Sequence, residues 1–121
     1  FCEREGIAEL MPALCATDYA QLDGDTITYG VIEPANLLPS EETEGDTAGG
    51  TPAENAHILR DILGGIDHTA RRGMVVLNAA ATCLVAGLGN CLKDCIPLAE
   101  RSIDTKAALH KLETLVEASR A

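Results

Sequence analysis

The stretch 74–85 constrains the fold most, because ten of its twelve side chains are apolar. A helix that is apolar nearly all round is buried inside a protein. We therefore predict a buried helix that starts at Arg72 or Gly73, reaches Ala86 and is ended by Gly87. Residues 75–77 alone could instead form a short buried strand, which hydrophobic periodicity does not exclude.

Asn78 is polar within this apolar helix. A buried amide without a partner costs a few kcal/mol, so we expect Asn78 to hydrogen bond to the backbone of a neighbouring segment. A contact with a ligand is the alternative. We expect the apolar stripes of the first and last predicted helices to cover the helix around Asn78.

The first predicted helix begins at Pro52. Thr51 and Glu54 have the spacing of a capping box, and proline suits the first helical position. Gly64-Gly65 ends this helix. Its apolar stripe consists of Ile58, Leu59, Ile62 and Leu63.

Two more helices are predicted near the C-terminus. One covers about 91–103, with Asn90 as its cap and Pro97 inside it. The other covers about 106–118, with Thr105 as its cap. The buried stripe predicted for this last helix consists of Ala108, Leu109, Leu112, Leu115 and Val116.

Two short strands, 17–22 and 26–32, are predicted before the helices. The Asp23-Gly24 pair between them is a hairpin-turn signal. Residues 34–50 are rich in proline, glycine and acidic residues, which favours a surface connection. The fold class predicted is α+β and mostly helical, a β-hairpin followed by four helices. We expect one partial domain over 1–121, with the hairpin and acidic connection in 1–50 and the helical part in 51–121.

The net charge of −10 argues against a nucleic-acid or anionic-membrane partner. The first 59 residues carry 12 acidic residues and one basic residue, whereas the rest carry 7 and 8. The aromatic residues are Phe1, Tyr19 and Tyr29, too few for a base-stacking platform. No apolar run approaches the roughly 20 residues needed to span a bilayer.

The five cysteines are an odd number, and nothing resembles a signal peptide, which favours reduced thiols and a cytoplasmic location. Cys91 and Cys95 would share one helix face and could hold a metal with His110. Zinc sites favour tighter cysteine spacing and four ligands, so we expect two reduced thiols there. A catalytic Cys–His pair has no local signature in the sequence.

Three further sets of residues could bind a ligand. Gly49-Gly50-Thr51 precede a helix and could offer N–H groups to an anion, although the acidic neighbours favour simple chain reversal. Arg71-Arg72 could bind an anion, but a solvated pair is the favoured interpretation. Glu5 and Glu9 flank Gly6 and could coordinate Mg²⁺, with a solvated acidic face as the default.

The order of short motifs along the chain is its most specific feature. In order they are GGTPAENA at 49–56, ILR at 58–60, LGG at 63–65, RR at 71–72, VLNAAA at 76–81, VAG at 85–87, AAL at 107–109, KLE at 111–113 and LV at 115–116. In this order they resemble the C-terminal part of the anthranilate phosphoribosyltransferases. The resemblance covers roughly residues 1–118, and the hairpin around Asp23-Gly24 sits where that family has its own.

The resemblance implies part of the α/β domain of a transferase. Such an enzyme moves the phosphoribosyl group of phosphoribosyl pyrophosphate to the amine of anthranilate and releases pyrophosphate, a step of tryptophan biosynthesis. It also implies Mg²⁺ and a homodimer formed through an N-terminal helical domain. One alternative is a non-catalytic, diverged relative that acts as a binding or structural module. A cysteine-based metal or redox protein is a third interpretation.

The family's His-Gly-x-x-Gly-x-Asp-Glu stretch should fall on residues 2–9. Gly6 and Glu9 match it, so Glu9 is the one metal residue that the resemblance carries over. The histidine, first glycine and aspartate are replaced by Cys2, Glu3 and Ala8.

The family's Gly-Thr-Gly-Gly-Asp phosphate loop, its Lys-His-Gly-Asn segment and its dimerising helices have no counterpart in the sequence. No catalytic residue is therefore assigned, and the substrate-binding residues stay unassigned. The chain begins with Phe1, and we expect a piece of a longer protein or a processed product. We expect this chain alone to be inactive.

Overall fold

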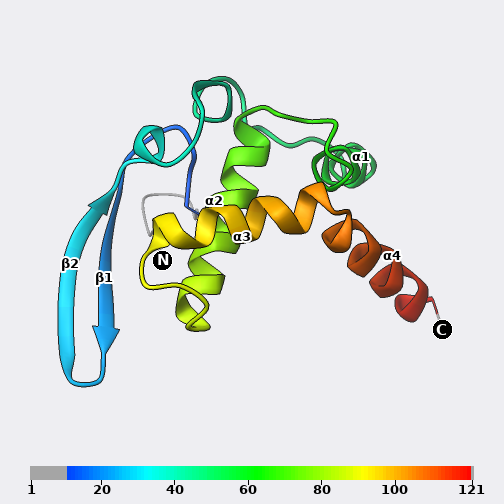
Figure 1. The fold of residues 1–121 in the computed structure, drawn as a ribbon. Helices are drawn as coiled ribbons and strands as arrows, with labels where there is room; N and C mark the ends of the chain where they lie inside the picture. The colour runs from blue at the N-terminus through cyan, green and yellow to red at the C-terminus, as the bar shows by residue number, and fades with distance from the viewer. Residues whose placement is uncertain (1–10, 121) are drawn as a thin grey trace.

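The computed structural model describes residues 11–120. A β-hairpin is followed by two short 3-10 helices and four α-helices, which confirms the predicted fold class (Figure 1). Their bounds are β1 Thr17–Asp23, β2 Thr26–Ile32, η1 Pro34–Asn36, η2 Ser40–Glu42, α1 Pro52–Leu63, α2 Ala70–Val85, α3 Leu92–Asp104 and α4 Ala107–Ser119. The hairpin lies on one side of the crossed helices α2 and α3, and α4 extends away on the other side.

The hairpin is antiparallel, with Thr17 paired to Ile32 at its base and Asp23 to Thr26 at its tip. Gly24 adopts a φ of 58° in the tight turn, a conformation that glycine reaches without strain. Within the hairpin Thr17 alone is buried. The strands therefore project from the rest of the described chain.

The core lies between α2 and α3. Val76, Leu77 and Cys95 are fully buried there, and they belong to one cluster that also includes Ala13 and Leu38. α3 contributes the buried side chains Cys95, Ile96, Ala99 and Ile103. These residues recur every three to four positions, so they form one helix face that packs against α2. The expectation that α1 and α4 cover α2 is wrong, because α3 is its main partner.

α2 confirms the predicted helix and rules out the strand alternative at 75–77, but it is buried along one face only, and Val85 near its end is 90% exposed. It begins at Ala70 because the side chain of Thr69 caps it by accepting from the N–H of Arg71. The predicted start at 72 or 73 is therefore late. Gly87, at a φ of 75°, follows the end of the helix as predicted.

The predicted caps of the last two helices are wrong. Cys91, not Asn90, is the N-cap of α3, and its side chain makes no capping bond. Thr105 closes the C-terminus of α3 instead of opening α4. Lys106 opens α4 from the left-handed region at a φ of 63°, and its ammonium donates to the carbonyl of Gly64 at the end of α1.

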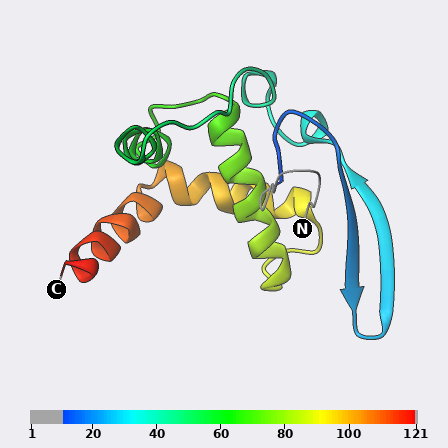
Figure 2. The ribbon, with the colours of Figure 1, turned by 180° about the vertical axis from the view of Figure 1, so that it is seen from behind.

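The stripe predicted to be buried on α4 is exposed or half-buried. α4 buries none of its side chains, and Leu115 is 65% exposed. Figure 2 shows α4 directed away from α2 and α3. On α1, Ile62 is buried and Leu59 is 38% exposed, so the stripe predicted there is only partly covered. The helices found among residues 11–120 lack the length and apolar content that crossing a membrane requires.

Candidate functional site

The N-terminus of α1 is closed by side chains of its own first turn. The N–H of Thr51 donates to Glu54 Oε2 at 2.7 Å, and the N–H of Glu54 donates to Thr51 Oγ1 at 3.3 Å, which confirms the capping box. The N–H of Gly50 donates to Asn55 Oδ1 at 2.8 Å, while Asn55 Nδ2 donates to the Gly50 carbonyl at 3.0 Å. The N–H groups of Gly50 and Thr51, which an anion would need, are thus already used.

Electrostatics point the same way at this helix end. Hydrogen bonds from the hydroxyl and the backbone N–H of Thr51 hold the pKa of the Glu54 carboxyl below its ordinary value. Glu54 is therefore negatively charged at neutral pH, in the place where a phosphate would sit. The structure favours the chain-reversal interpretation of Gly49-Gly50-Thr51 over anion binding.

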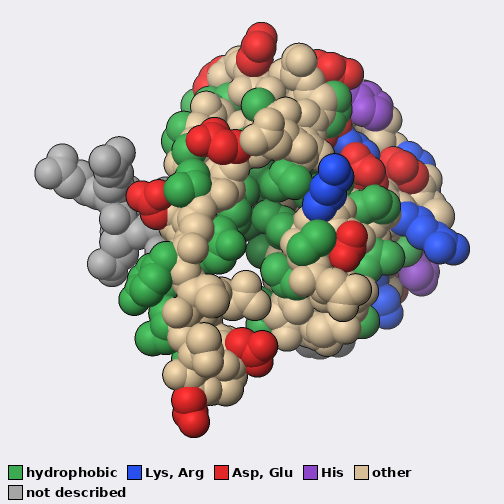
Figure 3. Space-filling model, turned by 60° about the vertical axis from the view of Figure 1, so that its left-hand side comes forward, with side chains coloured by type: hydrophobic (Ala, Val, Ile, Leu, Met, Phe, Trp, Pro, Cys, Tyr) green, Lys and Arg blue, Asp and Glu red, His purple; other side chains and the backbone are tan. Residues whose placement is uncertain are grey.

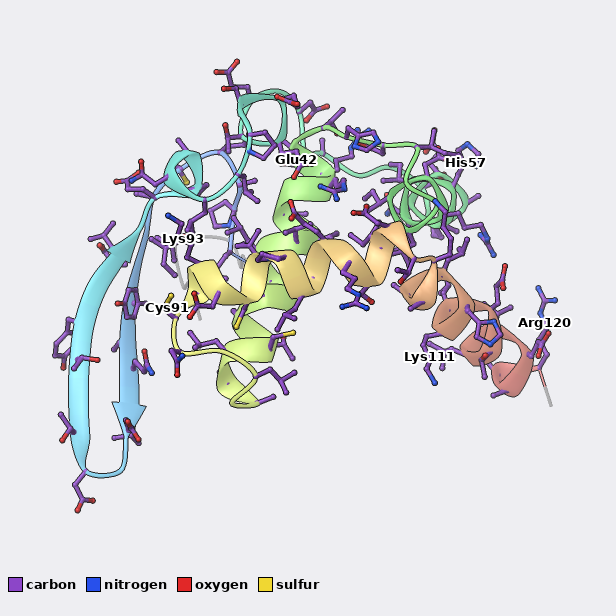
Figure 4. All side chains as sticks on the ribbon, in the orientation of Figure 1. Glu42, His57, Cys91, Lys93, Lys111 and Arg120 are labelled. Atoms are coloured by element: carbon purple, nitrogen blue, oxygen red, sulfur yellow. The ribbon has the colours of Figure 1, made fainter. Side chains whose placement is uncertain are left out.

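An open groove of about 550 Å³ lies beside this helix end. Arg71 lies on the groove, and its Nη2 donates to the carbonyl of Ala48 at 3.0 Å. His57 is also on the groove and lies 3.3 Å from the carboxylate of Asp61, one helical turn further along α1 (Figure 4). The residues that line the groove are Ala48, Gly49, Gly50, Ala53, Glu54, His57, Ile58 and Arg71.

Arg72 is buried rather than solvated, which corrects the interpretation of the Arg71-Arg72 pair. It is 5% exposed and forms an ion pair with Glu42, which is 2% exposed. Its other terminal nitrogen, Nη2, lies 3.5 Å from Asp104 Oδ1 at the end of α3. Figure 4 shows Glu42 beside the N-terminal end of α2. This ionic cluster joins η2, α2 and α3.

Glu42 is buried as well, so the predicted surface connection at 34–50 is wrong at this position. Desolvation raises the pKa of the Glu42 carboxyl, while the charge of Arg72 and the hydrogen bond from it act in the opposite direction. Within residues 11–120, Glu42 Oε2 and Arg72 Nε have no hydrogen-bond partner. The pair therefore depends on one direct contact, and the loss of either member would strand a buried charge.

Gly73 makes this burial possible. A Cβ atom at position 73 would lie 2.2 Å from the backbone oxygen of Glu42 and 3.0 Å from its Cβ. Any side chain here would push η2 away from α2. The absence of a side chain brings the backbone of η2 against α2 and puts Glu42 within reach of Arg72.

Asn78 hydrogen bonds to the backbone of a neighbouring segment, which confirms its predicted role. Asn78 Oδ1 accepts from the N–H of Met11 at 2.9 Å, and Nδ2 donates to the Met11 carbonyl at 2.9 Å and to the Met74 carbonyl at 2.7 Å. The amide thus fixes both backbone groups of one residue. Met11 lies two positions after Glu9, so this clamp anchors the chain next to the predicted metal stretch.

We expect Asn78→Ala to lower the free energy of unfolding by about 1–3 kcal/mol, because the N–H and C=O of Met11 both lose their partner. Urea denaturation measures the change. Thr82→Ala is the matched control, since the Thr82 hydroxyl is exposed and bonds only the carbonyl of Asn78, at 3.0 Å. An unchanged urea midpoint for Asn78→Ala would contradict the clamp.

The residues of the alternative cysteine metal site, Cys91, Cys95 and His110, do not form one cluster. Cys91 is exposed at the N-cap of α3, Cys95 is buried, and His110 lies on α4, 3.9 Å from Glu113. Burial raises the pKa of the Cys95 thiol, and the nearby Cys83, Asp94 and Cys91 add to that effect. Across residues 11–120, no group of three or more His, Cys, Asp or Glu side chains is arranged to hold a metal ion.

The predicted Mg²⁺ residues Glu5 and Glu9, with Gly6 between them, lie outside the described residues.

Three features of this region were not predicted from the sequence. They are the ionic cluster of Glu42, Arg72 and Asp104, the close approach at Gly73, and the Asn55 contacts with Gly50. One signal for the first was present: Arg72 directly precedes an almost wholly apolar run, where an unpaired arginine would be costly.

Comparison with known proteins gives one family and a set of similar enzymes. The model of the glycosyl transferase family, a/b domain, matches residues 2–109. The anthranilate phosphoribosyltransferase of Methanococcoides burtonii is 44% identical over 113 residues, which cover 93% of this chain and 31% of that relative. The enzyme of the same name from Syntrophobacter fumaroxidans is 40% identical, with 93% and 33% covered. The chain spans about a third of the length of these relatives.

Proposed function

Because the chain belongs to the glycosyl transferase family whose a/b domain it matches, we propose that it is the C-terminal part of an anthranilate phosphoribosyltransferase. The whole enzyme would join the phosphoribosyl group of phosphoribosyl pyrophosphate to the amine of anthranilate and release pyrophosphate. The observation that carries the proposal is the 44% identity to a relative of that name over 93% of this chain.

The described residues would serve this reaction as a scaffold. Asn78 holds both backbone groups of Met11, directly after the stretch that contains Glu9. We propose that Glu9 contributes to a Mg²⁺ site, with Ala8 in the position of the family's aspartate. Bound Mg²⁺ would neutralise charge on pyrophosphate. The groups that bind the substrates would come from the part of the enzyme outside this chain. A cytoplasmic location and a homodimer formed through an N-terminal helical domain complete the proposal.

Anthranilate is fluorescent, so its loss in the presence of phosphoribosyl pyrophosphate and Mg²⁺ measures the reaction. We expect turnover by the full-length protein, with release of one pyrophosphate for each anthranilate consumed. We expect none from residues 1–121 alone, because catalysis needs the reacting groups held together in one site.

A reaction mixture without phosphoribosyl pyrophosphate is the control. A folded full-length protein without turnover would contradict the proposed function and favour the non-catalytic module. Turnover by residues 1–121 alone would contradict the scaffold role.

A further inference from the structure

The hairpin has one apolar face that nothing in the described chain covers. The register pairs Ala20 with Tyr29 and Leu22 with Ile27, and Val31 lies on the same face one pair further along. The four large side chains are 68% exposed at Leu22, 54% at Ile27, 79% at Tyr29 and 57% at Val31. Ala20, Leu22, Ile27, Tyr29 and Val31 are called the outer face below.

The opposite face of the hairpin lies closer to the rest of the chain. It carries Thr17, which is buried, and Ile32, which is half-buried. The ring of Tyr19 covers Gly30 on this face, where a Cβ would lie 2.6 Å from the hydroxyl oxygen of Tyr19. Figure 3 shows hydrophobic side chains along the outer edge of the hairpin, away from the helical body. The outer face therefore points away from the α2–α3 core.

A two-stranded hairpin is marginally stable in water unless a third strand or a packed layer covers it. This hairpin has seven residues in each strand and both of its edges are free within residues 11–120. Isolated apolar residues on a surface are ordinary, but a contiguous row across two strands marks a contact surface. Burial of the outer face would therefore stabilise the hairpin.

The size of the outer face decides between possible covers. Seven residues at about 3.3 Å each give a face about 23 Å long, and two strands give a width of about 10 Å. Such a face offers a few hundred Å², well below the roughly 800 Å² per partner of a stable interface between separate proteins. A second copy held by this face alone would dissociate. A covalently connected segment avoids most of the cost of association, so a small face suffices for it.

The charges around the outer face are complementary to only one kind of cover. Asp18 borders the outer face, because it pairs with Val31, and Asp23 and Asp25 lie on either side of Gly24 in the turn. Residues 17–33 include no lysine or arginine. A cover would therefore present apolar side chains in its centre and basic or neutral groups at its rim.

We propose that the outer face is an intramolecular docking surface for the part of the transferase that lies outside residues 1–121. The curated relatives are about three times as long as this chain, so enough polypeptide exists in them to supply the cover. The proposal rests on the proposed function, since it needs the longer enzyme. It adds that the hairpin packs against the rest of that enzyme, and that this contact buries Leu22, Ile27, Tyr29 and Val31.

Hydroxyl-radical footprinting with peptide-level mass spectrometry tests this directly in the wild-type proteins. We expect oxidation of Tyr29 to fall several-fold in the full-length protein relative to residues 1–121, at every protein concentration. His110 is the internal control because its side chain is 79% exposed on α4. Equal oxidation of Tyr29 in both proteins would overturn the proposal. Protection of Tyr29 that grows with the concentration of residues 1–121 would assign the face to a second copy and also overturn it.

A variant gives a second, independent test. Ile27→Thr, Tyr29→Thr and Val31→Thr together place β-branched threonine, which suits a strand, at all three positions while removing most of the apolar surface. We expect this triple variant to lower the urea midpoint of the full-length protein and to leave that of residues 1–121 unchanged. Thr28→Ser, on the opposite face, is the matched control. An equal effect of the triple variant in both proteins would overturn the proposal.

Neither readout uses turnover, so the two proposals fail separately. An inactive full-length protein that protects Tyr29 would contradict the proposed function alone. An active enzyme with Tyr29 fully oxidised would contradict the docking surface alone.

Discussion

Arg72→Leu is expected to lower the free energy of unfolding of this chain by about 3–5 kcal/mol. The substitution leaves Glu42, which is 2% exposed, without the guanidinium that compensates its charge. It also removes the contact between Arg72 Nη2 and Asp104. A domain is stable by only about 5–15 kcal/mol, so this loss would be a large fraction of the total stability.

Urea denaturation followed by circular dichroism measures the effect, and a double variant identifies its cause. Glu42→Leu with Arg72→Leu removes both charges, and a buried ion pair replaced by apolar residues often costs little. We therefore expect the double variant to be clearly more stable than Arg72→Leu alone. If the two were equally unstable, the loss would come from packing and not from a stranded charge.

The neighbouring arginine provides the control. Arg71 is half-buried, and its guanidinium donates to one backbone carbonyl, that of Ala48. We expect Arg71→Leu to cost much less than Arg72→Leu. A similar loss of unfolding free energy for both variants would mean that the ionic cluster stabilises the chain no more than the single hydrogen bond of Arg71 does.

The ionic cluster could not be predicted from the sequence. Glu42 lies in an acidic segment with Glu41, Glu44 and Asp46, and the composition of this segment is typical of a solvent-exposed stretch. Its burial follows from Gly73, thirty-one positions later, which allows η2 to approach α2. No local sequence pattern predicts that Glu42 and Gly73 lie close together, because their contact forms only when η2 packs against α2.

Local signals, by contrast, were sufficient for most elements. The Asp23-Gly24 turn, the Thr51 and Glu54 capping box and Gly87 each satisfy backbone groups within a few residues of themselves. Such contacts do not depend on the rest of the fold. The predicted cap of α4 failed for the opposite reason: Lys106 adopts its left-handed conformation while its ammonium bonds to the carbonyl of Gly64 at the end of α1.

The same distinction applies to the candidate site. The chemistry of a lone amide in an apolar helix predicted that Asn78 would bind backbone, but not that its partner would be Met11. The α4 stripe was predicted from periodicity, which identifies an apolar face without saying what covers it. In this chain α3 occupies the position against α2, so Leu115 stays 65% exposed.

Leu77→Ala is expected to lower the free energy of unfolding by about 2–5 kcal/mol. Leu77 is fully buried between α2 and α3, in the cluster that contains Val76, Cys95 and Ile96. Truncation removes the apolar contacts of this side chain and leaves a cavity that the surrounding helices fill only in part. Urea denaturation again measures the change.

Leu115→Ala is the matched control, because it removes the same atoms from a position that is 65% exposed. We expect its effect to stay within about 0.5 kcal/mol, as for other surface substitutions. The two variants differ only in what surrounds the leucine, so their difference measures the α2–α3 packing itself. Equal losses would mean that α4 carries as much of the stability as α2, and the core assigned to this chain would then be wrong.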